Sequence, residues 1–124
     1  MSAFTKIGSG ILVSSGQTVT LPGRAGGRNA KGVQIMVVVT SSSDTAATTL
    51  KIGVSIEHGP DGEHYVEHTG NSTLIDVDEV PQVAKLDTNP NNGMVGEWVR
   101  TVFTATTQSG KWARLDVYEM RKPF

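Results

Sequence analysis

Histidines and carboxylates gather in one short stretch of the sequence and are the residue types best suited to bind a metal ion. His58, His64 and His68 lie there with acidic residues between them. A zinc site needs such groups to converge at about 2.0–2.2 Å from one ion. On one extended strand, however, His64 and His68 would be about 13 Å apart, since a strand rises about 3.3 Å per residue. The spacing therefore predicts no metal site, with His58 and His64 paired across a turn as the weaker alternative.

A second acidic group could support hydrolysis or calcium binding. Asp76, Asp78 and Glu79 lie together in the segment LIDVDEVP. Two carboxyl groups about 5–10 Å apart can cleave a glycosidic bond, but the segment lacks the rest of an EF-hand loop. We interpret it as a solvated strand edge that discourages aggregation. The chain also lacks GxSxG, HExxH, GxGxxG and P-loop motifs, so we predict no enzymatic activity and no cofactor.

Aromatic and basic residues indicate binding functions instead. Trp98, Trp112 and Tyr118 could line a carbohydrate platform on one sheet face, because an aromatic side chain combines an apolar body with a polar tip. The two tryptophans are predicted to lie on the two strands of one C-terminal hairpin.

Two segments are predicted to contact partner molecules. The Gly-rich segment 21–32 could hold an acidic surface or a phosphate, and residues near the N-terminus show no core alternation. Both would lose conformational entropy on ordering, so we expect neighbouring subunits to order them. The predicted contact residues are Phe4, Ile7, Arg24, Arg28 and Lys31.

Strands are the elements predicted to position these residues. Val and Thr outnumber Ala and Leu, and β-branched side chains favour pleated sheets. Residues 48–58 alternate apolar and polar positions, which indicates one buried face. Pro60 and Gly62 then predict a turn, with Gly62 at positive φ. Residues 63–69 should return as a hairpin partner.

The remaining strands complete an all-β chain. Residues 33–40 are apolar at nearly every position and predict a central strand buried on both faces. Residues 97–106 and 111–120 predict a second hairpin, and weaker strands are expected at 10–14, 17–21, 74–77 and 82–86. Turn signals every 8–12 residues or so predict an antiparallel β-sandwich or jelly roll of about eight short strands.

Size and charge limit the partners further. A chain of 124 residues predicts one domain, which we place at residues 10–124 behind a flexible N-terminal arm at 1–9. The formal net charge of −1 argues against nucleic-acid binding. No apolar run approaches the 20 or so residues that span a bilayer, so no membrane association is expected. The absence of cysteine excludes disulfides.

Two segments resemble small virion proteins of tailed bacteriophages. Residues 48–65 run as an alternating strand into a Pro-Asp-Gly turn and an aromatic residue. Residues 96–118 contain Trp-Val-Arg followed by strands around a Gly turn. The resemblance covers about half of the chain and implies a β-sandwich of the capsid decoration or cement type, or of the neck or tail accessory type.

This resemblance implies a structural protein of the virion, assembled in the cytoplasm of a bacterial host. It would bind across subunits of the capsid surface and stabilise the shell by mass action. The implied partners are the major capsid protein or other virion subunits, together with further copies of the chain. The alternative is a carbohydrate-binding or host-recognition β-sandwich module.

Overall fold

A computed structural model describes residues 4–26, 31–43, 50–77, 80–88, 93–105 and 110–123. Within these ranges the chain forms nine strands and no helix, so no described segment is a helix able to cross a membrane. The strands are β1 (Thr5–Ser14), β2 (Thr18–Thr20), β3 (Arg24–Ala25), β4 (Gly32–Ser42), β5 (Lys51–Gly59), β6 (Val66–Asp76), β7 (Gln82–Asp87), β8 (Trp98–Ala105) and β9 (Trp112–Lys122). The Val80–Pro81 peptide bond before β7 is cis.

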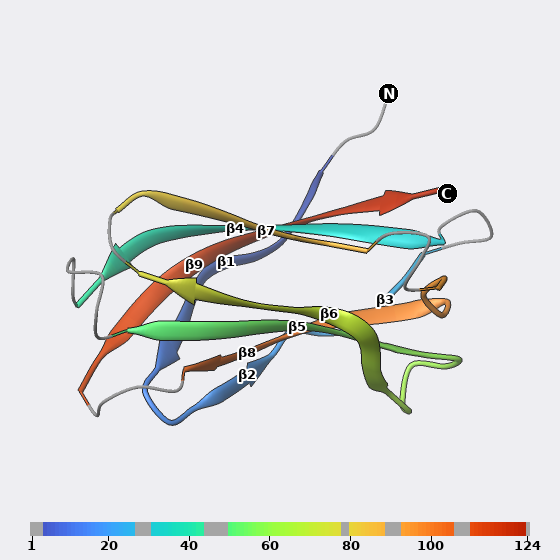
Figure 1. The fold of residues 1–124 in the computed structure, drawn as a ribbon, viewed down its shortest axis with the longest axis horizontal. Helices are drawn as coiled ribbons and strands as arrows, with labels where there is room; N and C mark the ends of the chain where they lie inside the picture. Colours follow the sequence, from blue (N-terminus) through green and yellow to red (C-terminus); the bar gives the residue numbers. More distant parts are fainter. Residues whose placement is uncertain are drawn as a thin grey trace.

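The strands form two antiparallel sheets that stack face to face (Figure 1). Sheet A has the order β1-β9-β4-β7. Sheet B has the order β2-β8-β5-β6, with β3 also paired to β8. The predicted all-β antiparallel sandwich is therefore confirmed.

The core lies between the two sheets and follows the predicted alternation. On β5, Ile52, Val54 and Ile56 face inward and are almost fully buried. On β4, the buried residues alternate with half-buried Met36 and Val38. The predicted central position of β4 in its sheet is correct, but burial of both its faces is not, because no layer of the described strands covers the outer face of sheet A.

Of the two predicted hairpins, the first is confirmed and the second is wrong. β5 and β6 pair directly around the 60–65 turn. β8 instead pairs with β5, β2 and β3, whereas β9 pairs with β1 and β4. β8 therefore belongs to sheet B and β9 to sheet A, and each lies between two other strands of its own sheet. The alternating pattern predicts one buried face and does not specify which strand lies alongside.

The N-terminal region differs from the predicted flexible arm, because β1 begins at Thr5 and pairs with β9 from Glu119 onward. Ile7 packs against the core. Register shifts on either side of Gly8 interrupt the two-residue period, and Gly10 has a positive φ of 59°. These irregularities hide the first half of the strand from a search for regular alternation, whereas its second half was expected at 10–14.

Candidate functional site

Three shallow depressions on the described surface hold side chains with binding chemistry. One of them, of about 430 Å³, lies on the outer face of sheet B around Gly53, Ser55, Ser72, Leu74 and Thr104. A second, of about 350 Å³, lies beside the β5–β6 turn and Gly96. A third, of about 230 Å³, lies on the outer face of sheet A around Trp112. All three open widely to solvent, so they suit contacts with a partner surface or a sugar ring.

The turn between β5 and β6 is built around Asp61. Its carboxylate accepts hydrogen bonds from the backbone N–H groups of Glu63 (2.9 Å) and His64 (2.7 Å), and it contacts Nδ1 of His64 at 2.9 Å. The backbone hydrogen bonds, first that from Glu63, lower the pKa of Asp61 to about 2. Gly62 does not have the predicted positive φ, because Asp61 supplies the side-chain-to-backbone bonds that close the turn.

This turn packs against β8 through Arg100. The Arg100 guanidinium lies 2.6 Å from a carboxylate oxygen of Glu57, and its central carbon is 4.1 Å from the centre of the Tyr65 ring. A Cβ added to Gly62 would lie 3.6 Å from the Trp98 ring. The two segments that carry the resemblance to virion proteins therefore contact each other directly.

The three histidines have three different environments. His58 accepts a hydrogen bond at Nδ1 from the backbone N–H of Gly96 (2.8 Å), and its ring meets that of buried His68 edge-on at 4.7 Å. Burial, and then the charge of His68, lower the pKa of His58 below 6.5. His64 is exposed and pairs with Asp61. His58 and His64 line the same depression, but no group of three metal-ligating side chains occurs among the described residues.

The candidate carboxylate group is only partly described. Asp76 is exposed and forms an ion pair with Lys51 at 2.9 Å. Asp78 and Glu79 lie outside the described residues. Asp76 thus serves as one side of a cross-strand pair between β5 and β6.

The predicted aromatic platform is not a single surface. Trp98 belongs to β8 of sheet B, whereas Trp112 and Tyr118 belong to β9 of sheet A. All three point outward on their strands, so Trp98 lies on the opposite side of the sandwich from the other two. Trp112 and Tyr118 are about 20 Å apart along β9, given a rise of about 3.4 Å per residue. Only Trp112 lines one of the three depressions.

The predicted partner-contacting residues have mixed environments. Phe4 and Lys31 are exposed, whereas Ile7 packs against the core. Arg28 lies outside the described residues. Arg24 lies on β3, and its Nε is 3.8 Å from a carboxylate oxygen of Glu119. Arg24 therefore has an acidic partner within the chain, which the sequence did not indicate.

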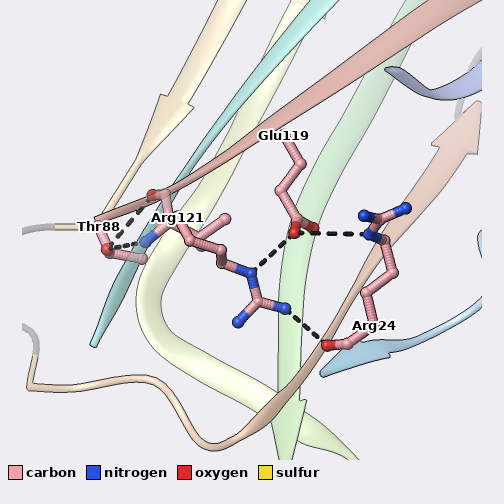
Figure 2. A network of polar contacts seen from close by, with 5 residues as sticks. Arg24, Thr88, Glu119 and Arg121 are labelled. Atoms are coloured by element: carbon pink, nitrogen blue, oxygen red, sulfur yellow. Dashed lines mark hydrogen bonds and ion pairs between the residues drawn. The ribbon is translucent and has the colours of Figure 1, made fainter. Parts of the chain in front are cut away.

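A polar network between the two sheets was not predicted (Figure 2). Glu119 is only 5% exposed and receives a 2.7 Å hydrogen bond from Nε of Arg121. Arg121 also donates from Nη2 to the backbone carbonyl of Arg24 (2.6 Å), which links β9 of sheet A to β3 of sheet B. The sequence does hold a signal, because Glu119 and Arg121 continue the inward-facing positions of Ala113, Leu115 and Val117. A charge at a core position needs a buried partner.

Comparison with known proteins shows the fold alone. No known protein family matches the chain, and no curated protein sequence matches it. The chain is similar in structure to the CBM36-1 domain of a multidomain xylanase from the hindgut metagenome of Trinervitermes trinervoides, with a TM-score of 0.51, 9% identity and 98% of each chain covered. A weaker likeness to FLHE has a TM-score of 0.37 and 11% identity over 96% of this chain and 93% of that one.

Proposed function

We propose that this chain is a structural, non-catalytic protein of a bacteriophage particle. It would bind the capsid surface across subunit boundaries, with the major capsid protein and further copies of itself as neighbours. The observation that supports this is the contact of Arg100 with both Glu57 and Tyr65. It joins the two segments that resemble virion proteins, which are distant in sequence, into one packed unit.

The outer faces of the sandwich have the chemistry for such docking. Large apolar side chains stand exposed on them among polar neighbours, which suits protein interfaces with an apolar centre and a polar rim. On these faces the most exposed are Leu12 (44%), Leu74 (52%) and Val83 (58%); Val66 (64%), the first residue of β6, and Met94 (62%), between β7 and β8, are exposed as well. If the protein binds the assembled shell but not the free capsid subunits, its binding stabilises the shell by mass action.

The test is whether the chain is present in phage particles. An antibody against the purified protein is used to label particles, and their peptides are sequenced by mass spectrometry. We expect decoration of intact capsids at regular intervals and self-association in mass photometry. A protein that stays monomeric at all concentrations and is absent from particles would refute the proposal.

A second candidate function is carbohydrate binding. Two observations support it: the likeness to the fold of a CBM36-1 domain, and the depression that Trp112 lines on sheet A. A glycan array tests it, with Trp112→Leu expected to abolish binding. Trp98→Leu is the matched control, because Trp98 packs near Gly62 on the other side of the sandwich.

A further inference from the structure

Four side chains on the outer face of sheet A surround one depression of about 230 Å³. Leu12 and Ser14 come from β1, and they pair directly across the strands with Arg114 and Trp112 of β9. The depression therefore combines an indole ring, a guanidinium group, a hydroxyl group and an aliphatic side chain. Its volume suits one monosaccharide ring better than a larger ligand.

The backbone of Trp112 is held at both its N–H and its carbonyl by Ser42 and Ser43. Its N–H donates to the hydroxyl of Ser43 (2.9 Å), and its carbonyl accepts from the hydroxyls of Ser42 (3.3 Å) and Ser43 (3.2 Å). The backbone N–H of Ser43 also donates to the same carbonyl (2.9 Å). These bonds fix the strand beneath the indole, so little further ordering of the backbone is needed when a ligand binds.

Arg114 differs from the other arginines that the structure describes. Arg24 and Arg121 pair with Glu119, and Arg100 pairs with Glu57. Within the described ranges Arg114 pairs with no carboxylate, and its Nη1 makes only a 3.3 Å bond to the carbonyl of Gly10.

The nearest acidic side chain on the same strand face is Asp116, which is already engaged. It accepts a 2.9 Å hydrogen bond from the backbone N–H of Gly10 and lies 3.3 Å from Nζ of Lys6. Both contacts lower its pKa, the Gly10 bond most. The remaining hydrogen-bond donors of Arg114 are therefore available to an external anion.

We infer that this depression binds a carboxylated sugar residue of a glycan. The indole of Trp112 would stack on the C–H face of the ring, and Arg114 would bind the carboxylate through paired N–H donors. Ser14 would bond a ring hydroxyl, and Leu12 would cover the edge of the ring. A neutral sugar would leave Arg114 unused, and a simple anion would leave Trp112 unused. The inference rests on the second candidate function, carbohydrate binding.

The test compares acidic and neutral oligosaccharides by calorimetry and by NMR shift mapping. The acidic probes are oligosaccharides of galacturonate, guluronate and glucuronate, and sialyllactose; the neutral probes are maltotriose and lactose. We expect at least one acidic probe to shift the resonances of Trp112 and Arg114 and to bind about tenfold or more tightly than its neutral counterpart. Arg114→Gln should weaken that binding about tenfold, as expected for loss of a charge-assisted hydrogen bond.

Two further variants make the result decisive. Trp112→Leu should also weaken binding about tenfold or more, while Lys85→Gln, an exposed cation on β7 of the same sheet, should leave it within about twofold. Thermal denaturation of every variant checks that each is folded.

The outcomes that would overturn the inference are distinct. One is full binding of the acidic probe by Arg114→Gln, and another is the absence of binding by all acidic probes. Equal binding of neutral and acidic probes, lost only in Trp112→Leu, would also overturn it but would support carbohydrate binding. No binding by any probe would count against both.

Discussion

A carboxylate oxygen of Glu119 on sheet A lies 3.8 Å from Nε of Arg24 on sheet B, and Glu119 is buried whereas the Arg24 side chain is 44% exposed. The same carboxylate also binds Arg121, whose side chain is only 16% exposed. Glu119→Ala would leave the guanidinium of Arg121 largely desolvated and without its carboxylate partner. Loss of one partner of a buried pair costs several kcal/mol, so we expect unfolding to become about 2–4 kcal/mol easier in urea denaturation.

Arg24→Ala is the matched control for this prediction. Its exposed charge contributes little through the ion pair, about 0–1 kcal/mol for a surface contact. Its carbonyl, which accepts from Arg121, is retained in the variant. Similar losses in the Arg24 and Glu119 variants would contradict the buried Glu119–Arg121 pair as the main source of the stabilisation by Glu119.

Thr101 is fully buried on β8, and its hydroxyl has no hydrogen-bond partner among the residues that the structure describes. A buried, unpaired hydroxyl costs about 1–3 kcal/mol. Thr101→Val replaces it with a methyl group of similar shape and should raise stability by about 1 kcal/mol in denaturant titration. Thr101→Ser keeps the hydroxyl and removes a methyl, so it should destabilise the protein. Equal stability of the valine and serine variants would show that the hydroxyl is paired in solution.

His58 predicts a pH-dependent stability. Its folded-state pKa lies below the ordinary value of 6.5, so the unfolded chain binds the proton more readily. Stability should therefore fall as pH drops below about 6.5 and level off below the lowered pKa. Protonation at Nδ1 would also turn the acceptor for the Gly96 N–H into a donor.

The comparison is between the parent and His58→Asn, measured by chemical denaturation at a series of pH values. Asparagine can place an acceptor oxygen near the position of Nδ1 but does not titrate. The variant should lose part of the acid-dependent decline between neutral and mildly acidic pH. The charged groups nearby are His68 against the ring, His64 with Asp61 in the turn, and Glu57 with Arg100 on the other strand face. An unchanged pH profile in the variant would contradict His58 as the source of the decline.

The face assignment on β5 follows from the sequence and can be tested there. Ile52 is fully buried, and Ile52→Ala should cost about 2–4 kcal/mol. Lys51, on the opposite face, forms an exposed pair with Asp76, so Lys51→Ala should change stability by no more than about 0.5 kcal/mol. Equal losses at the two positions would mean that both faces of β5 are covered.

The sequence predicted the regular strands well because a two-residue period directly reports one buried face. It predicted the β5–β6 hairpin because a short turn joins two such strands. Alternation along β8 and β9 was read correctly, but their partners were not, because pairing between distant strands leaves no local signal. Only the second half of β1 was predicted, at 10–14, because the irregular register around Gly8 breaks the period in its first half.

The candidate sites were harder to predict because they depend on which strands become neighbours. Trp98 and Trp112 lie close in sequence yet on opposite sides of the sandwich, since the chain changes sheet between them. Arg114 and Leu12 are distant in sequence yet directly opposed across β9 and β1. Residue types predicted Trp112 as a binding residue, but only the strand order shows what lies beside it.

In the N-terminal region, Ile7 is expected to contribute to stability, whereas Phe4 is expected to contribute to binding of partner subunits. Ile7 packs against the core, so Ile7→Ala should destabilise the protein by about 1–2 kcal/mol, less than a fully buried isoleucine because it is only half-buried. Phe4 is 38% exposed just before β1, and Phe4→Ala should leave the melting temperature close to that of the parent. If Phe4 anchors neighbouring subunits, the same variant should lose self-association or particle binding, measured by mass photometry and co-sedimentation with capsids. Parent-like association of folded Phe4→Ala would move the proposed contact to the outer sheet faces around Leu74 and Val83.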